Sequence, residues 1–208
     1  MKTVCMVNGS PRLEKSTSLV FLKDLEAGLG TEDFRTVFIS LNIKKGGAVP
    51  QESLLVLAEA DVIIFSFPLY AYSLPAPLIK LLEAYYHWSI EQKDNSAVKR
   101  VYAVVNSGFP ESSINKEALR VIKLFCRRTG FTWRFGAAIG GGMVVAMMKH
   151  IPLVNRRLKK VYKKIIDDIF QGSESPAEDI AIKPVIPKPV MLYMKDSKFS
   201  KRMMAKKI

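Results

Sequence analysis

Apolar residues follow two alternating patterns between Met1 and Phe170. Short continuous apolar runs rich in β-branched residues predict buried β-strands, and apolar residues spaced three or four apart predict amphipathic helices. The predicted strands are Lys2–Val7, Phe34–Ile39, Asp61–Phe65, Val101–Val105 and Phe131–Ile139. The predicted helices are Ser16–Gly28, Gln51–Glu59, Pro75–Glu91, Ile114–Arg128 and Leu153–Phe170. Strands that alternate with helices indicate an α/β protein whose parallel sheet is covered by helices on both faces.

Length and composition fit one globular domain followed by a tail. The chain has 208 residues, of which 49% are apolar and 25% charged, as in ordinary globular proteins. We predict a domain over residues 1–171 and a basic, proline-punctuated tail over 172–208. The longest apolar runs are too short to span a bilayer, and no secretory signal can be drawn, so we expect a cytoplasmic protein. With two cysteines and two histidines, neither a disulfide framework nor a metal site is expected, and both cysteines should be buried.

Positive charge concentrates in the last third of the chain. The formal net charge is +13, and from Lys149 to Ile208 there are 15 Lys and Arg against 6 Asp and Glu. Such a surface attracts a phosphorylated cofactor, acidic lipid, nucleic acid or an acidic protein. In the segment Pro184–Ile208 basic residues interleave with Met, Tyr and Phe. This tail is expected to pack across the domain or a twin subunit, or to lie peripherally on an anionic membrane. Nucleic acid is the least favoured partner, because no recognition module is evident.

Three loops follow the first, third and fourth predicted strands. The carboxyl ends of parallel strands lie at one edge of the sheet, so these loops should meet there. In such folds ligands bind at that edge, where the strand order reverses. The first loop, Asn8-Gly9-Ser10-Pro11-Arg12, opens into a helix through hydroxyl residues. Backbone N–H groups, the helix dipole and hydroxyls together suit a phosphate group. An ordinary turn with Ser16 as the helix N-cap is the alternative interpretation.

The other two loops differ from each other in character. Residues 66–77 are apolar, aromatic and rich in proline, whereas Asn106–Ser113 contains a glycine turn with polar edges. A flat, mostly apolar ring system could pack against the first of these while backbone groups bond its edge. The alternatives are a loop that covers the sheet edge and a plain turn in which Ser113 caps the next helix.

Together the loops resemble those of the NAD(P)H-dependent FMN reductase branch of the flavodoxin-like superfamily. The matching pieces are Gly9-Ser10-Pro11-Arg12 with Ser16–Ser18, Pro68-Leu69-Tyr70 with Leu74–Pro77, and Asn106-Ser107-Gly108-Phe109. The resemblance implies a flavodoxin-like, doubly wound five-stranded parallel sheet of order 2-1-3-4-5, and three groups of residues around FMN. Ser10, Arg12, Ser16, Thr17 and Ser18 would hold the phosphate; Pro68, Leu69, Tyr70, Ala71, Tyr72 and Ser73 would line one edge and face of the isoalloxazine; Asn106, Ser107, Gly108, Phe109 and Glu111 would approach its other edge.

The same resemblance implies an enzyme, an FMN-dependent NAD(P)H oxidoreductase that forms a homodimer. FMN would accept hydride from NADH or NADPH and then reduce quinone-like, nitro or azo compounds with ping-pong kinetics, without a catalytic side chain. Some relatives hold an iron–sulfur cluster, but Leu41–Pro50 has no cysteine, so flavin is the only redox centre expected. A flavodoxin-type electron carrier is one alternative. The other is a noncatalytic protein of this fold that binds a membrane or a partner through its basic tail.

Overall fold

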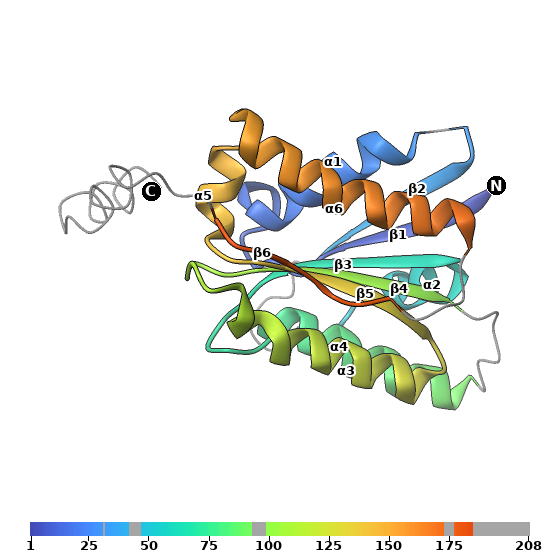
Figure 1. The fold of residues 1–208 in the computed structure, drawn as a ribbon. Helices are drawn as coiled ribbons and strands as arrows, with labels where there is room; N and C mark the ends of the chain where they lie inside the picture. Colours follow the sequence, from blue (N-terminus) through green and yellow to red (C-terminus); the bar gives the residue numbers. More distant parts are fainter. Residues whose placement is uncertain (31, 42–46, 93–98, 173–176, 185–208) are drawn as a thin grey trace.

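A computed structural model describes residues 1–30, 32–41, 47–92, 99–172 and 177–184 (Figure 1). These residues form a parallel six-stranded sheet of order β2-β1-β3-β4-β5-β6. The strands are β1 Lys2–Asn8, β2 Phe34–Ser40, β3 Val62–Pro68, β4 Arg100–Asn106, β5 Thr132–Ile139 and β6 Ile180–Ile182. The helices are α1 Thr17–Leu29, α2 Gln51–Glu59, α3 Ala76–Glu91, α4 Lys116–Thr129, α5 Gly142–Met147 and α6 Pro152–Gln171. The predicted α/β class and the strand order 2-1-3-4-5 are confirmed.

The sheet lies between two layers of helices, which explains why its central strands are apolar throughout. Alternate residues of a strand face opposite sides of a sheet. Val4 and Met6 pack on the side of α1 and α6, whereas Cys5 and Val7 pack on the side of α2, α3 and α4. Both faces of β1 therefore need apolar side chains, as parallel sheets generally do.

Besides two short 3₁₀ helices, η1 Leu13–Lys15 and η2 Ser112–Asn115, a strand and a helix were not predicted. The sixth strand, β6, lies within residues 172–208, which the sequence predicts as a tail, and its Ala181 pairs with Ala138 of β5. Asp179 fixes its approach by accepting a hydrogen bond from the Gly136 N–H at 2.6 Å. The helix, α5, begins at Gly142, directly after two further glycines that follow β5. The rest of the tail, 173–176 and 185–208, lies outside the described residues. No helix in the described ranges is long and apolar enough to cross a membrane.

A buried ion pair fastens α6 to the sheet. The Arg134 side chain is 1% exposed, and its Nε and Nη2 donate to the two carboxylate oxygens of Asp168, each at 2.8 Å. The Tyr102 hydroxyl donates to the same carboxylate at 2.7 Å, and Arg100 donates to the carbonyls of Asp168 and Ile169. Burial would raise the pKa of Asp168, but the hydrogen bonds from Arg134 and Tyr102 hold it below its usual range.

Both cysteines are buried and free, as predicted. Burial raises the pKa of the Cys5 and Cys126 thiols to about 12, because a thiolate loses its hydration inside the core. Neither thiol is therefore poised for nucleophilic or redox chemistry.

Candidate ligand-binding site

Three loops meet at the carboxyl edge of the sheet because the strands that precede them end level with one another. Asn8 at the end of β1 is in register with Ser66 of β3, and Pro68 at the end of β3 is in register with Asn106 of β4. Backbone bonds continue this alignment into the loops. The Gly9 N–H donates to the Ser66 carbonyl at 2.9 Å, and the Leu69 N–H donates to the Asn106 carbonyl at 2.7 Å. The predicted convergence of the loops is confirmed.

The first loop presents the start of α1. Ser16 is its N-cap, because its Oγ accepts from the Leu19 N–H at 3.2 Å and donates to Asn8 Oδ1 at 3.3 Å. Among the described residues, the N–H groups of Thr17 and Ser18 have no hydrogen-bond acceptor. Unpartnered N–H groups at the positive end of a helix dipole form a site for an anion.

The Asn8 side chain holds this loop in shape. Its Oδ1 accepts from the Ser10 N–H at 3.2 Å, and its Nδ2 donates to the Leu13 carbonyl at 3.0 Å. Leu13 has a φ of 50°, a left-handed conformation that is uncommon for a residue with a side chain. Asn8 belongs to the predicted first loop but is not among the predicted site residues, because its role depends on contacts across the loop.

The second loop folds into a tight turn with strained backbone at its tip. Tyr70 and Ser73 exchange two backbone hydrogen bonds of 2.9 Å, and the intervening Ala71 and Tyr72 have φ values of 47° and 60°. Two left-handed central residues define a type I′ turn, a conformation that normally selects glycine or asparagine. Together with Leu13, these are the only non-glycine residues of the described ranges at positive φ. Strain of this kind gathers at functional sites.

The third loop is tied to both of the others through Asn106. Its Nδ2 donates to Ser18 Oγ at 3.0 Å and to the Phe67 carbonyl at 3.1 Å. The Gly142 N–H donates to the Ser107 carbonyl at 2.8 Å, so α5 supports the loop from behind. Glycine is required at 142 because a Cβ there would lie 2.5 Å from the Asn106 Cβ.

Two aromatic rings stand exposed on the second and third loops. Tyr72 is 66% and Phe109 54% exposed, and their rings lie nearly parallel, with centroids 6.3 Å apart and 17° between the planes. Tyr70, at 40% exposure, adds a third apolar surface. Large exposed aromatic side chains beside one another are rare away from binding sites. This part of the edge suits a flat, apolar ring.

The structure brings the predicted residues to one edge but gives them unequal exposure. Arg12, Gly108 and Glu111 are exposed, as are Tyr70, Ala71, Tyr72 and Phe109, while Thr17, Pro68, Leu69 and Ser73 are half-buried and Ser10, Ser16, Ser18, Asn106 and Ser107 are buried. The buried polar residues of this set serve mainly to hold the loops together. Sequence reasoning missed Ser66, whose buried hydroxyl has no partner among the described residues. Such orphaned groups mark functional sites, but a serine inside an apolar strand gives no signal of its own.

A family comparison agrees with this geometry. The model of a family described as having a flavodoxin-like fold matches residues 2–134, more than half of the chain. The chain belongs to the flavodoxin-like fold family. The matched range of this flavodoxin-like protein contains all three loops, and it ends within β5, before α5, α6 and β6.

Solved structures with the same fold cover most of this flavodoxin-like protein. An NADH:FMN oxidoreductase in its apo form matches with a TM-score of 0.64 and 16% identity, over 85% of this chain and 92% of that one. An NADPH-quinone reductase from P. pentosaceus matches with a TM-score of 0.55 and 20% identity, over 80% of this chain and 98% of that one. An FMN-dependent NADH-azoreductase from Bacillus anthracis in complex with FMN matches with a TM-score of 0.57 and 11% identity, over 80% of this chain and 100% of that one. At these identities the likeness shows the fold. Among curated protein sequences no significant match is found.

Proposed function

We propose that this protein is an FMN-dependent NAD(P)H oxidoreductase whose three carboxyl-edge loops hold the flavin. One observation carries the proposal: the unpartnered N–H groups of Thr17 and Ser18 lie at the same sheet edge as the exposed parallel rings of Tyr72 and Phe109. The first feature suits a phosphate and the second a flat ring, which are the two ends of FMN. The names of the similar solved structures, which include quinone reductases and an FMN-dependent azoreductase, support the same assignment.

The phosphate would be held chiefly by backbone groups. Ser16 commits its hydroxyl to Asn8 and to the helix cap, so its role is to fix the start of α1. Ser18 Oγ accepts from Asn106, which leaves its own hydroxyl proton free to donate. The exposed Arg12 guanidinium and the buried Ser10 would complete the phosphate end, where positive charge and N–H donors favour an anion.

The ring would lie against the second and third loops. Pro68–Ser73 supply an edge and a face, with Tyr70 and Tyr72 as the apolar surface, and Asn106–Phe109 together with Glu111 supply the other edge. The tight type I′ turn fixes the backbone that carries Tyr72, and the Tyr72 ring lies nearly parallel to that of Phe109. A preorganised surface binds a flat ligand with little loss of side-chain freedom.

Bound FMN would supply hydride acceptance from NADH or NADPH and donation to a second substrate. The chain's own residues bind and orient the reactants. The apolar rings select planar acceptors, namely quinone-like, nitro or azo compounds, because a flat ring buries the most area against them. Donor and acceptor would use the same exposed surface in turn, which predicts ping-pong kinetics. Intersecting rather than parallel double-reciprocal lines would contradict shared use of the surface.

The direct test is binding of FMN and of riboflavin, which lacks the phosphate. Thr17 is the first residue of α1, where proline is tolerated, and Ser16 before it is already extended at φ −95° and ψ 142°. The variant T17P therefore deletes one N–H without disturbing the helix. T17A is the matched control, because it removes the hydroxyl and keeps the N–H. We expect T17P to bind FMN about 10- to 100-fold more weakly than T17A, as for a lost hydrogen bond to a charged group, and to bind riboflavin equally well.

Absence of flavin absorbance after incubation with FMN would overturn the proposal, and so would equal FMN affinity of T17P and T17A. Catalysis is tested separately, by adding NADH or NADPH to the FMN-loaded protein without oxygen. Rapid bleaching of the flavin without a helper reductase supports an enzyme. Flavin that stays oxidised supports the electron carrier. Reoxidation by a quinone, a nitroaromatic and an azo dye in parallel then identifies the acceptor class.

A homodimer belongs to the same proposal, because the family resemblance implies one. Light scattering after size-exclusion chromatography, with and without FMN, would test it. A monomer in both conditions would contradict this part and leave the flavin assignment intact.

A further inference from the structure

The outward face of α6 carries a dense row of cations. Arg157, Lys160 and Lys164 follow one another at spacings of three and four residues, with Leu153 one turn before them, which places all four along one side of a helix. Another side of the helix is buried in the core, through Val154, Leu158, Val161, Ile165 and Ile169. The apolar side of this helix is therefore already used, and its cations lie on the exposed side.

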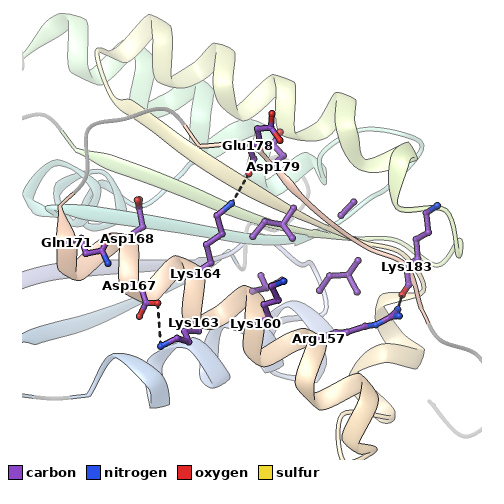
Figure 2. A pocket seen from close by; sticks show the side chains of 14 residues that line it. Arg157, Lys160, Lys163, Lys164, Asp167, Asp168, Gln171, Glu178, Asp179 and Lys183 are labelled. Atoms are coloured by element: carbon purple, nitrogen blue, oxygen red, sulfur yellow. Dashed lines mark hydrogen bonds and ion pairs between the residues drawn. The ribbon is translucent and has the colours of Figure 1, made fainter.

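Negative charge is confined to the far half of α6. Arg156, Lys159 and Lys160 have no charged or hydrogen-bonding partner among the described residues. Lys163 pairs with Asp167 at 3.6 Å, further along the helix. The groove beside α6 is a cavity of about 1030 Å³, and Figure 2 shows the same division of charge along it. Arg157 and Lys160 line one end, and all four acids, Asp167, Asp168, Glu178 and Asp179, lie toward the other.

The cationic half of α6 adjoins exposed apolar side chains and the carboxyl edge of the sheet. Met147 at the end of α5 is 58% exposed, and Leu153 in the first turn of α6 is 48% exposed. Arg157 Nη1 donates to the Lys183 carbonyl at 3.1 Å, which ties this half of α6 to the segment after β6. We call this surface the α6 corner, and define it as Met147, Leu153, Arg156, Lys159 and Lys160.

We propose that the α6 corner binds the surface of an anionic lipid bilayer, independently of flavin and of residues 185–208. Charge complementarity supplies the attraction, because cations near an anionic membrane each raise binding about fivefold. Met147 and Leu153 would enter the headgroup layer beside the cations, as apolar residues do in interfacial helices. A nucleic acid would use the cations but would gain nothing from two aliphatic side chains, so the bilayer is the favoured partner.

The proposal fixes an orientation. The N-terminal half of α6 and α5 lie at the end of the molecule where the strands reach their carboxyl ends (Figure 1). Docking by the α6 corner therefore brings that sheet edge toward the membrane. Helix α4 on the opposite face is also basic, with Lys116, Lys123 and Arg127, but its cations are spread along the whole helix. It serves as the internal control.

The test is co-sedimentation of the full-length protein with vesicles of phosphatidylcholine alone or mixed with phosphatidylglycerol. The test variant is R156E/K159E/K160E, in which the carboxylates introduced at positions 159 and 160 acquire favourable i,i+4 partners at Lys163 and Lys164, so α6 should remain folded. The control K116E/K123E/R127E changes the net charge equally on the other face. We expect wild type and control to bind the mixed vesicles in low salt and to be released by high salt. The test variant should bind at least about 100-fold more weakly.

Three results would overturn the proposal. Equal losses of vesicle binding in the two triple variants would mean that the net charge attracts the protein to the membrane without a preferred docking surface. Full binding by the test variant, with loss on truncation after Pro184, would assign the membrane contact to the tail. Binding of duplex DNA or RNA by the wild type, with no binding to the vesicles, would assign the cations to nucleic acid. Circular dichroism of each variant, matched to wild type, excludes unfolding as the cause, and L153Q gives a second reading because a bilayer contact predicts a further, smaller loss.

Discussion

Removing the carboxylate of Asp168 tests the ion pair that fastens α6 to the sheet. In the variant D168N the Arg134 guanidinium, 1% exposed, would keep its charge and lose its counter-ion. Breaking a buried pair from one side costs about 3–5 kcal/mol. The Asp168 side chain is 13% exposed, so water relieves part of this penalty and we expect about 3 kcal/mol. The neighbouring variant D167N is the control: Asp167 is 46% exposed and 3.6 Å from Lys163, a surface pair whose loss should cost under about 1 kcal/mol.

Urea unfolding followed by far-UV circular dichroism measures both variants. With an m-value of about 3 kcal/mol/M, D168N should unfold at about 1 M less urea than wild type, whereas D167N should nearly overlay it. The double variant R134M/D168L removes both charges and should recover most of the lost stability, because the cost lies in the unpaired charge. A midpoint for D168N equal to that of D167N would refute the argument. So would a double variant less stable than D168N.

Three further predictions concern the same core and the site. Because the folded pKa of Asp168 is lowered, its contribution to stability is present above its unfolded pKa, near 4, and is lost as the pH falls through the folded pKa. The free energy of unfolding of wild type should therefore drop more between neutral and acid pH than that of D168N. Parallel curves of unfolding free energy against pH for the two proteins would contradict this. G140A would place a Cβ against the Pro110 carbonyl oxygen, a backbone atom that cannot rotate away. We expect the free energy of unfolding, measured in urea, to fall by about 1–3 kcal/mol and FMN to bind more weakly. A urea midpoint equal to that of wild type would contradict this, because it would mean that the loop shifts to accommodate the Cβ. The buried thiols of Cys5 and Cys126, with pKa values near 12, should react with a thiol reagent at pH 8 only after denaturant is added, and fast reaction of the native protein would contradict their burial.

The sequence predicted the fold well where a single pattern determines an element. Central strands such as Val62–Pro68 are buried on both faces, so their continuous apolar runs are unambiguous. The start of α1 was also accessible, since Ser16 caps it as its residue type suggested, whereas the N-cap of α4 is Asn115 and not Ser113. The strand β6 was missed because three residues carry no periodicity, and its position depends on the bond between Asp179 and Gly136.

The candidate site divides in the same way. Glycines, prolines and aromatic residues after strands marked all three loops, because loop chemistry is visible in residue types. The residues that hold the loops together were less visible. Asn106 and Ser18 are both predicted as flavin contacts, but the hydrogen bond that joins them spans 88 positions; the buried pair of Arg134 and Asp168, which fastens α6 to the sheet, spans 34. Contacts at such separations are made by the folded chain and leave no local spacing in the sequence.

The left-handed backbone of Ala71 and Tyr72 sets function against stability in this protein. An L-residue in that conformation costs about 1–2 kcal/mol relative to the right-handed one, whereas glycine adopts it freely. Substituting glycine for Tyr72 would relieve its share of this cost and remove the ring that lies parallel to Phe109. The folded state thus gives up stability to hold an exposed aromatic ring at the carboxyl edge of the sheet, a trade-off familiar at active sites. A search for stabilising substitutions would select against the aromatic surface on which we expect the flavin to lie.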